Sequence, residues 1–169
     1  GDEEIASPTS RPLIEAAARE ADLVCVLEPA RANGEYVTQR KGVGTYTLKV
    51  AGKASHAGAR PEDGASAIHE LLRKLNAVLD LQRPPGFTLN VGVVRGGIRP
   101  NVVADLAEAE IDVRAPTPSD VDWIEAQMRR IAAETHVTGT TTELGGGIEF
   151  PPMPRTAATR SCGKPWPAI

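Results

Sequence analysis

The spacing of hydrophobic residues changes near residue 42. Before that point, residues 12–20 have the good helix formers and the one-sided apolar positions of a helix. The continuous apolar run 23–27 is typical of a strand that is buried on both faces. A helix followed by such a strand indicates a parallel sheet. We therefore predict that residues 1–41 form part of an α/β domain.

From residue 42 onward, strand and helix patterns alternate. Helical spacing of apolar residues predicts helices at 65–81 and 118–133, and alternating or β-branched residues predict strands at 45–50, 87–94, 102–115 and 137–144. The order β-α-β-β-α-β is that of the ferredoxin-like fold, in which two helices cover one face of a four-stranded antiparallel sheet. We predict this α+β fold for residues 42–144, and a linker and an aberrant or truncated tail for the proline-rich residues 145–169.

Composition limits the classes of partner. Hydrophobic residues make up 41% and charged residues 24% of the chain, and the net charge of -3 is mixed along it. This balance is typical of a globular protein and gives no sign of a nucleic-acid or membrane partner. The acidic start differs from a signal peptide, and two cysteines make no disulfide framework. We expect a cytoplasmic location.

Acidic residues occur where two predicted parallel strands end. Glu4 ends the presumed first strand, and Glu28 ends the next one after a single helix. Because neighbouring strands lie about 4.8 Å apart and their carboxyl ends share an edge, both carboxylates are expected at one rim, where they suit a divalent cation such as zinc. Glu3 beside them is a candidate proton acceptor for a metal-bound water. The alternative is that Glu3 and Glu4 belong to an acidic chain end that is exposed to solvent and binds no metal.

Three histidines are candidates for the imidazole ligands that a catalytic zinc usually needs. His69 is expected on a helix surface and His136 at a helix end, both in structural roles. His56 lies in the loop Ala54-Ser55-His56-Ala57-Gly58, where small neighbours give its ring little to pack against. A functional and a structural role weigh equally for His56 on this pattern alone. No His-X-Asp pair occurs, so the sequence does not complete a metal site.

Four sequence motifs occur in this chain, and their combination is highly specific for one protein family. They are Asp2-Glu3-Glu4; Leu27-Glu28-Pro29; Gly52-Lys53-Ala54-Ser55-His56-Ala57-Gly58 with Pro61-Glu62 and Gly64; and Asn101-Val102-Val103 with Asp112-Val113-Arg114. Over about residues 1–158 the chain resembles the zinc-dependent family of glutamate carboxypeptidase, aminoacylase, acetylornithine deacetylase and succinyl-diaminopimelate desuccinylase. The resemblance implies a hydrolase that cleaves an amide bond of N-acyl amino acids or of a C-terminal peptide residue, and a homodimer formed through the ferredoxin-like domain.

The resemblance also implies site residues. Glu3 is similar to the general base that activates a water between two zinc ions, and Glu4 and Glu28 are similar to ligands of those ions. His56 resembles the residue that enters the partner subunit's active site and stabilises the oxyanion. Asn101 and Arg114 resemble groups that hold the substrate, with Arg114 pairing with its free carboxylate. The alternative for Arg114 is a strand arginine that faces solvent.

The sequence also departs from the family. The His-X-Asp motif and the bridging Asp that precede Glu3 in the family, and a zinc-binding His far downstream, have no counterpart in this chain. We therefore expect a fragment that is inactive by itself. The alternative is a ferredoxin-like dimerisation or binding module without catalytic function, which explains the second part of the chain equally well but leaves Glu3, Glu4, Glu28 and His56 unexplained.

Overall fold

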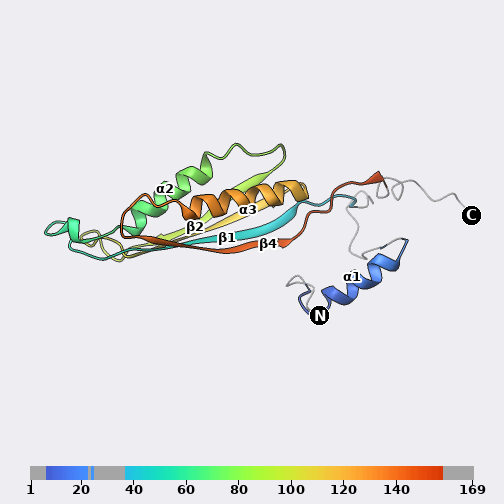
Figure 1. The fold of residues 1–169 in the computed structure, drawn as a ribbon, viewed down its shortest axis with the longest axis horizontal. Helices are drawn as coiled ribbons and strands as arrows, with labels where there is room; N and C mark the ends of the chain where they lie inside the picture. The colour runs from blue at the N-terminus through green and yellow to red at the C-terminus, as the bar shows by residue number, and fades with distance from the viewer. Residues whose placement is uncertain (1–6, 23, 25–36, 158–169) are drawn as a thin grey trace, which may run out of the picture. The chain divides into compact units, whose positions relative to one another are not determined.

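The computed structural model describes residues 7–22, 24 and 37–157 (Figure 1). The chain divides into two compact units, residues 1–38 with 155–169, and residues 39–154. The described part of the first unit contains one long helix, α1 (Arg11–Glu20), close to the predicted 12–20. The strand expected at 23–27 lies, apart from Val24, outside the described residues.

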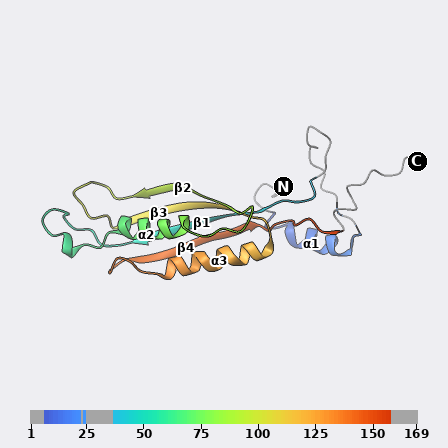
Figure 2. The same cartoon turned by 90° about the horizontal axis from the view of Figure 1, so that it is seen from above.

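Residues 39–154 form a four-stranded antiparallel sheet with two helices on one face (Figures 1 and 2). The strand order is β2-β3-β1-β4. The elements are β1 (Gly42–Ala51), α2 (Ala67–Leu79), β2 (Thr88–Gly96), β3 (Leu106–Ala115), α3 (Pro118–Ala133) and β4 (Thr141–Phe150), with a short 3-10 turn, η2 (Pro61–Asp63). The predicted ferredoxin-like fold is confirmed. The three-part division of the whole chain stays a prediction.

The core lies between the sheet and the helices. Alternate residues of β1 and β3 face the helices, and every third or fourth residue of α2 and α3 faces the sheet. The fully buried members include Leu48, Val50, Ile111, Val113, Leu71, Val78, Ile124, Met128 and Ile131. Such burial of apolar surface is the main stabilising contribution to the fold. The opposite face of the sheet carries polar and charged side chains, among them the exposed pair Arg95–Glu110 at 3.2 Å.

Side-chain caps explain where both helices begin. Thr117 and Asp120 form a reciprocal capping box at the start of α3, which begins at Pro118 as predicted. The Ser66 hydroxyl accepts a hydrogen bond from the backbone N–H of His69 at 3.2 Å at the start of α2. No helix among the described residues is both long and apolar enough to cross a bilayer.

A buried ion pair links the two helices. Lys74 and Glu70, both on α2, are 0% exposed and lie 3.1 Å apart. The Lys74 ammonium donates to the carbonyls of Ile131, Ala132 and Glu134 at the end of α3. Glu70 accepts from the backbone N–H groups of His136 and Val137, at 2.8 and 2.6 Å. The pair therefore provides hydrogen-bond partners for five backbone groups at the end of α3 and in the loop that follows it.

The last strand differs from the prediction. β4 runs from Thr141 to Phe150 rather than from 137 to 144, so the expectation of a linker is wrong for residues 145–150. Three consecutive glycines, 145–147, hide the strand pattern, because without side chains they carry no polar or apolar signal. The strand nevertheless pairs with β1 along this stretch, and Ile148 packs against the core.

The two ends of the sheet have different surroundings. At one end, the base, the chain enters and leaves the unit through a bridge between Arg40 and Met153, with N–O distances of 3.0 and 2.9 Å. At the other end, the tip, the loops 52–64 and 97–105 lie together. β3 spans the distance between them, with Leu106 at the tip end and Arg114 near the base.

Candidate functional site

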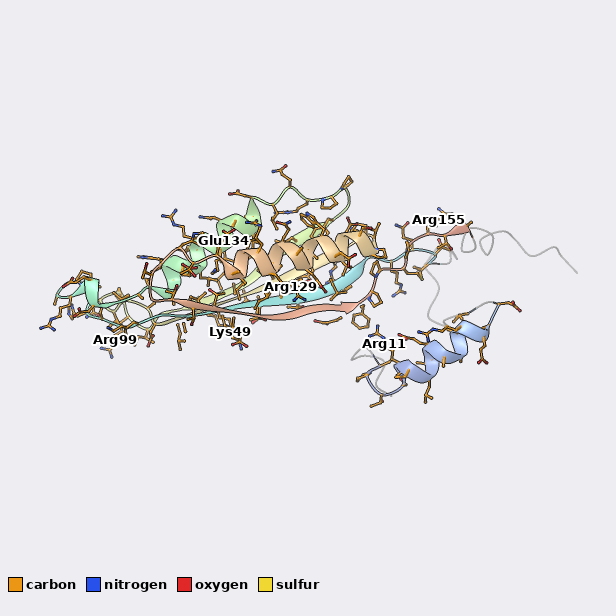
Figure 3. The ribbon with its side chains drawn as sticks, viewed as in Figure 1. Arg11, Lys49, Arg99, Arg129, Glu134 and Arg155 are labelled. Atoms are coloured by element: carbon orange, nitrogen blue, oxygen red, sulfur yellow. The ribbon has the colours of Figure 1, made fainter. Side chains whose placement is uncertain are left out.

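Backbone pairing joins the two tip loops. His56 forms an isolated antiparallel bridge with Val102, and the N–H of Val103 donates to the carbonyl of Ser55 at 2.9 Å. The N–H of Ala57 donates to the carbonyl of Asn101 at 3.0 Å. β3 therefore begins at Leu106 and not at the predicted 102, because residues 101–103 pair with the loop of His56 instead. Arg99 extends from the same end (Figure 3). The structure thus brings His56 and the backbone of Asn101 together.

The ring of His56 is held in one tautomer. Its Nδ1 accepts hydrogen bonds from the backbone N–H groups of Gly58, at 3.2 Å, and Ala59, at 3.1 Å. Because a backbone N–H can only donate, Nδ1 carries no proton, and the neutral ring carries its proton on Nε2. Nε2 has no hydrogen-bond partner within the described part of the chain, and the residue is exposed. His56 therefore presents a fixed N–H donor to the surroundings.

Two glycines of the His56 motif are required by packing. A Cβ on Gly52 would collide with the carbonyl oxygen of Ala65, and a Cβ on Gly64 would collide with the hydroxyl of Ser55 and press on Val103. These positions therefore serve the close approach of the loop to its neighbours. The two glycines let the loop that carries His56 pack closely, and they take no part in the chemistry of the ring.

The tip has a wide, shallow depression of about 550 Å³ beside His56. Lys53, Ser55 and Arg60 are among its lining residues. The Ser55 hydroxyl is buried and has no hydrogen-bond partner in the parts of the chain that are described. Arg60 and Asp63 form an exposed pair at 3.9 Å. The depression is open and has charges of both signs, so by itself it does not define a substrate.

Arg114 lies far from the tip. Its guanidinium forms two hydrogen bonds with Asp112, at 3.0 and 2.8 Å, on the polar face of the sheet. Leu106 and Arg114 are eight positions apart on the extended strand, which corresponds to about 27 Å at the usual rise per residue. One subunit therefore does not place Arg114 beside Asn101, and the predicted substrate-binding role of both residues stays a prediction.

The predicted metal site is untested. Glu3, Glu4 and Glu28 lie outside the described residues. Within the described ranges, no group of three or more His, Cys, Asp or Glu side chains is arranged to hold a metal ion. The described residues therefore do not fit a zinc site by themselves, and the roles predicted for the three glutamates stay predictions.

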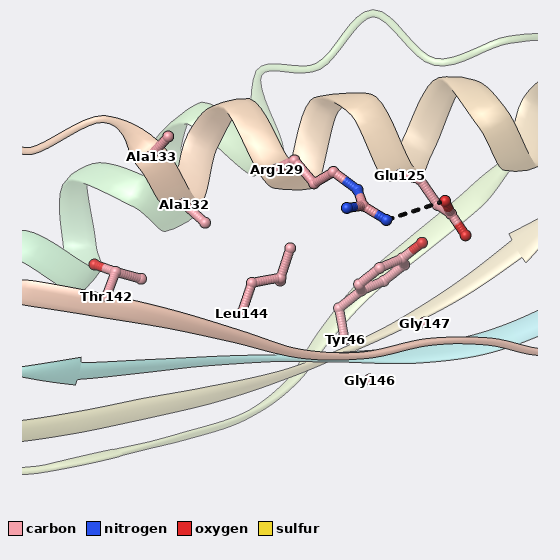
Figure 4. Close-up of a pocket in the computed structure, with 9 residues that line it drawn as sticks. All are labelled: Tyr46, Glu125, Arg129, Ala132, Ala133, Thr142, Leu144, Gly146 and Gly147. Carbon is pink, nitrogen blue, oxygen red and sulfur yellow. Dashed lines mark ion pairs between the residues drawn. The ribbon is translucent and has the colours of Figure 1, made fainter.

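A second hollow, which the sequence did not indicate, lies between α3 and β4 (Figure 4). Its volume is about 380 Å³, and Tyr46, Glu125 and Arg129 line it together with residues of β4. Tyr46 has the spacing of an ordinary core residue of β1. The hollow arises from contacts between segments far apart in the chain, and for that reason no local pattern signals it.

The comparisons with known proteins identify the family. Residues 38–140 match the model of the peptidase dimerisation domain of the M20 family. N-acetyl-L-citrulline deacetylase of Xanthomonas campestris is 34% identical over 115 residues, which are 62% of this chain and 31% of that protein. Carboxypeptidase G2 of Pseudomonas sp. is 34% identical over 126 residues, 72% of this chain and 30% of that protein.

Solved structures share the fold. Aminopeptidase PepT of Bacillus cereus superposes with a TM-score of 0.63 and 23% identity, over 76% of this chain and 35% of that one. The chain thus spans about a third of the length of the curated relatives and solved structures cited here. The matches confirm the resemblance inferred from the four motifs. By its matching domain, the chain belongs to the M20 peptidase dimerisation domain family.

Proposed function

We propose that this chain provides the dimerisation domain of a zinc-dependent hydrolase that cleaves amide bonds of N-acyl amino acids or of C-terminal peptide residues, and that it donates His56 to the active site of its partner subunit. The relatives described above support the reaction class, since one is a deacetylase and the other a carboxypeptidase. The roles of Glu3 as base and of Glu4 and Glu28 as metal ligands are parts of this proposal.

The observation that carries the proposal is the geometry of His56. Two backbone N–H groups fix its ring so that Nε2 is a donor that faces outward. A donor that is already in place can stabilise an oxygen atom that becomes negative during the reaction, without reorganising at that moment. His56 lies at the tip, whereas the chain enters and leaves the domain at the base.

One side of the domain has the features of a self-association surface. The outer edge of β2 has no strand partner among the described residues. Next to it, the apolar side chains of Leu72 and Leu79 on α2 and of Val94 on β2 are 50%, 51% and 55% exposed. The other edge is less suitable, because β4 contains Gly146 at a φ of 77° and α3 beside it presents charged residues such as Arg129. We propose that β2 and α2 meet their symmetry mates.

The twofold symmetry of such a dimer brings the tip of one subunit toward the base of the other. If two β2 strands pair antiparallel around a twofold axis, the tip of each subunit lies toward the base of the other. His56 and Asn101, at the tip of one subunit, would then lie at the same end of the dimer as Arg114, near the base of its partner. This arrangement gives the distant residues Asn101 and Arg114 a common site, which one subunit does not provide.

A chimera tests the proposal. Residues 39–154 would replace the corresponding domain of carboxypeptidase G2, and the carboxypeptidase activity of the product would be compared with that of the His56→Ala variant. Loss of a transition-state donor is expected to lower kcat about 10²–10³-fold with a much smaller change in KM. His136→Ala, at an exposed position between α3 and β4 and outside the β2–α2 surface, is the matched control and is expected to keep full activity.

Two results would contradict the proposal. A His56→Ala chimera with undiminished kcat would remove the catalytic role of the ring. Zinc-dependent hydrolysis of N-acyl amino acids by the purified 169-residue chain alone would contradict our expectation that this chain is inactive by itself. A non-catalytic dimerisation module, the alternative, predicts that His56→Ala changes neither kcat nor assembly.

A further inference from the structure

Tyr46 has an unused hydrogen-bond donor inside the hollow between α3 and β4. The residue is 2% exposed, and its hydroxyl oxygen is buried without a hydrogen-bond partner in the described part of the chain. Buried polar groups are nearly always hydrogen-bonded, so such a hydroxyl needs an explanation. Figure 4 shows it directed toward the side chains of Glu125 and Arg129. The hydroxyl is thus available to a molecule that enters between them.

Glu125 and Arg129 form the mouth of the hollow. Their side chains lie 3.6 Å apart, one helical turn from each other on α3, and are 41% and 76% exposed. Ion pairs this exposed are weak because water screens them and the side chains lose freedom when they pair. Separating the two groups is therefore easy, and each can turn to a ligand of opposite charge.

β4 leaves room beneath this mouth. Gly146 has a φ of 77°, and a Cβ there would collide with the carbonyl oxygen of Thr45. Gly147 also lines the hollow, and a Cβ built on it meets no atom within 4 Å. The volume of the hollow, about 380 Å³, is in the range of small-molecule sites.

The charges select the class of ligand. A simple anion would be attracted by Arg129 but repelled by Glu125, and a simple cation would meet the reverse problem. A molecule with a carboxylate and an ammonium group a few atoms apart matches both. We propose that this hollow binds a free α-amino acid, whose carboxylate accepts hydrogen bonds from Arg129 and the Tyr46 hydroxyl and whose ammonium group pairs with Glu125.

The protonation state of Tyr46 agrees with this role. Burial raises the pKa of Tyr46 to about 12, with a further increase from the charge of Glu125 and a decrease from that of Arg129. The hydroxyl therefore keeps its proton at neutral pH and remains a donor. The site is separate from the tip loops, and it does not depend on the hydrolase proposed above.

The test is a titration of the ¹⁵N-labelled 169-residue chain with glycine, L-alanine and L-glutamate, followed by the amide NMR signals of Gly146 and Gly147. We expect saturable shifts with at least one amino acid, and weaker binding of acetate and methylammonium, each of which offers only one of the two charges. Arg129→Gln and Tyr46→Phe are expected to weaken binding about fivefold or more, as the loss of one hydrogen bond to a charged group does.

Two comparisons separate a ligand site from a structural role. Arg130→Gln removes the same charge from the same helix outside the hollow, where Arg130 pairs with Glu134 at 2.6 Å, and it is expected to leave binding unchanged. Tyr46→Phe is expected to keep the unfolding midpoint, because the lost hydroxyl has no partner. The proposal is overturned if none of the three amino acids gives a saturable shift, if both pocket variants bind as tightly as the parent chain, or if acetate binds as tightly as the amino acids.

Discussion

Replacing Lys74 with methionine is expected to destabilise residues 39–154 severely. Methionine keeps most of the length of the side chain but removes the ammonium that lies 3.1 Å from the fully buried Glu70. The variant leaves a buried carboxylate without its counter-ion and the carbonyls of Ile131 and Ala132 without their donor. Breaking such a pair from one side costs about 3–5 kcal/mol. This is a large part of the stability of a small domain, which is about 5–15 kcal/mol.

Urea denaturation followed by far-UV circular dichroism measures this loss. The matched control is Lys49→Met, because Lys49 lies 4.0 Å from Glu108 on the polar face and is 60% exposed. A surface pair contributes about 0–1 kcal/mol, so the control variant should unfold close to the parent chain. The double variant Lys74→Met with Glu70→Gln should recover part of the loss, since it no longer buries an unpaired charge.

Equal effects of Lys74→Met and Lys49→Met would refute this account of the ion pair. So would a double variant that is less stable than the sum of the two single losses. Either result would mean that the free energy of unfolding does not depend on the charge balance between α2 and the end of α3.

The pair also predicts a dependence on pH. Burial alone raises the pKa of Glu70, but Lys74 and the N–H groups of His136 and Val137 outweigh burial, so its pKa is lowered from the ordinary value of 4.5. A lowered pKa in the folded state adds stability above the unfolded-state pKa, and this contribution is lost as the pH falls through the folded-state pKa. We expect the free energy of unfolding to fall below about pH 4.5, less steeply in Glu70→Gln. Identical slopes in both proteins would contradict this.

Three further substitutions test other parts of the structure. Val94→Asp on the β2 edge should convert the proposed dimer to a monomer in light scattering, whereas Thr141→Asp on the β4 edge should not; the reverse pattern would assign the interface to β4. Gly146→Ala should lower the unfolding midpoint because of the positive φ and the contact with Thr45, while Gly145→Ala, whose Cβ would lie 3.8 Å from Thr47, should change it little. Thr117→Ala should cost about 1 kcal/mol through loss of the capping box, and no change would show that the cap is dispensable.

Local patterns were sufficient for most of the fold. The limits of α3 agree with the prediction, since Thr117 and Pro118 mark its start and its apolar residues recur at helical spacing. Long-range contacts were not predictable in the same way. The ion pair of Glu70 and Lys74 resembles any exposed pair one turn apart on a helix, and only the packing of α2 against α3 buries it. The glycines of β4 carried no pattern at all.

The candidate site was predictable only in part. The motif around His56 was recognisable, because a polar ring among small residues is unusual, but its fixed tautomer depends on the fold of the loop. Asn101 and Arg114 are close in sequence, yet Asn101 precedes β3 at the tip and Arg114 lies near the other end of that strand, about 27 Å beyond Leu106. Sequence distance therefore did not show that the proposed common site of Asn101 and Arg114 requires two subunits.

A mixed dimer tests most directly whether His56 acts in the partner's active site. Two inactive chimeras would be co-expressed, one with His56→Ala and the other with an inactivating change in the catalytic domain of carboxypeptidase G2. If His56 acts across the interface, each mixed dimer contains one complete site, and random assembly restores about a quarter of the parental activity. If His56 acts within its own subunit, no complete site forms and the mixture stays inactive, which would contradict the account.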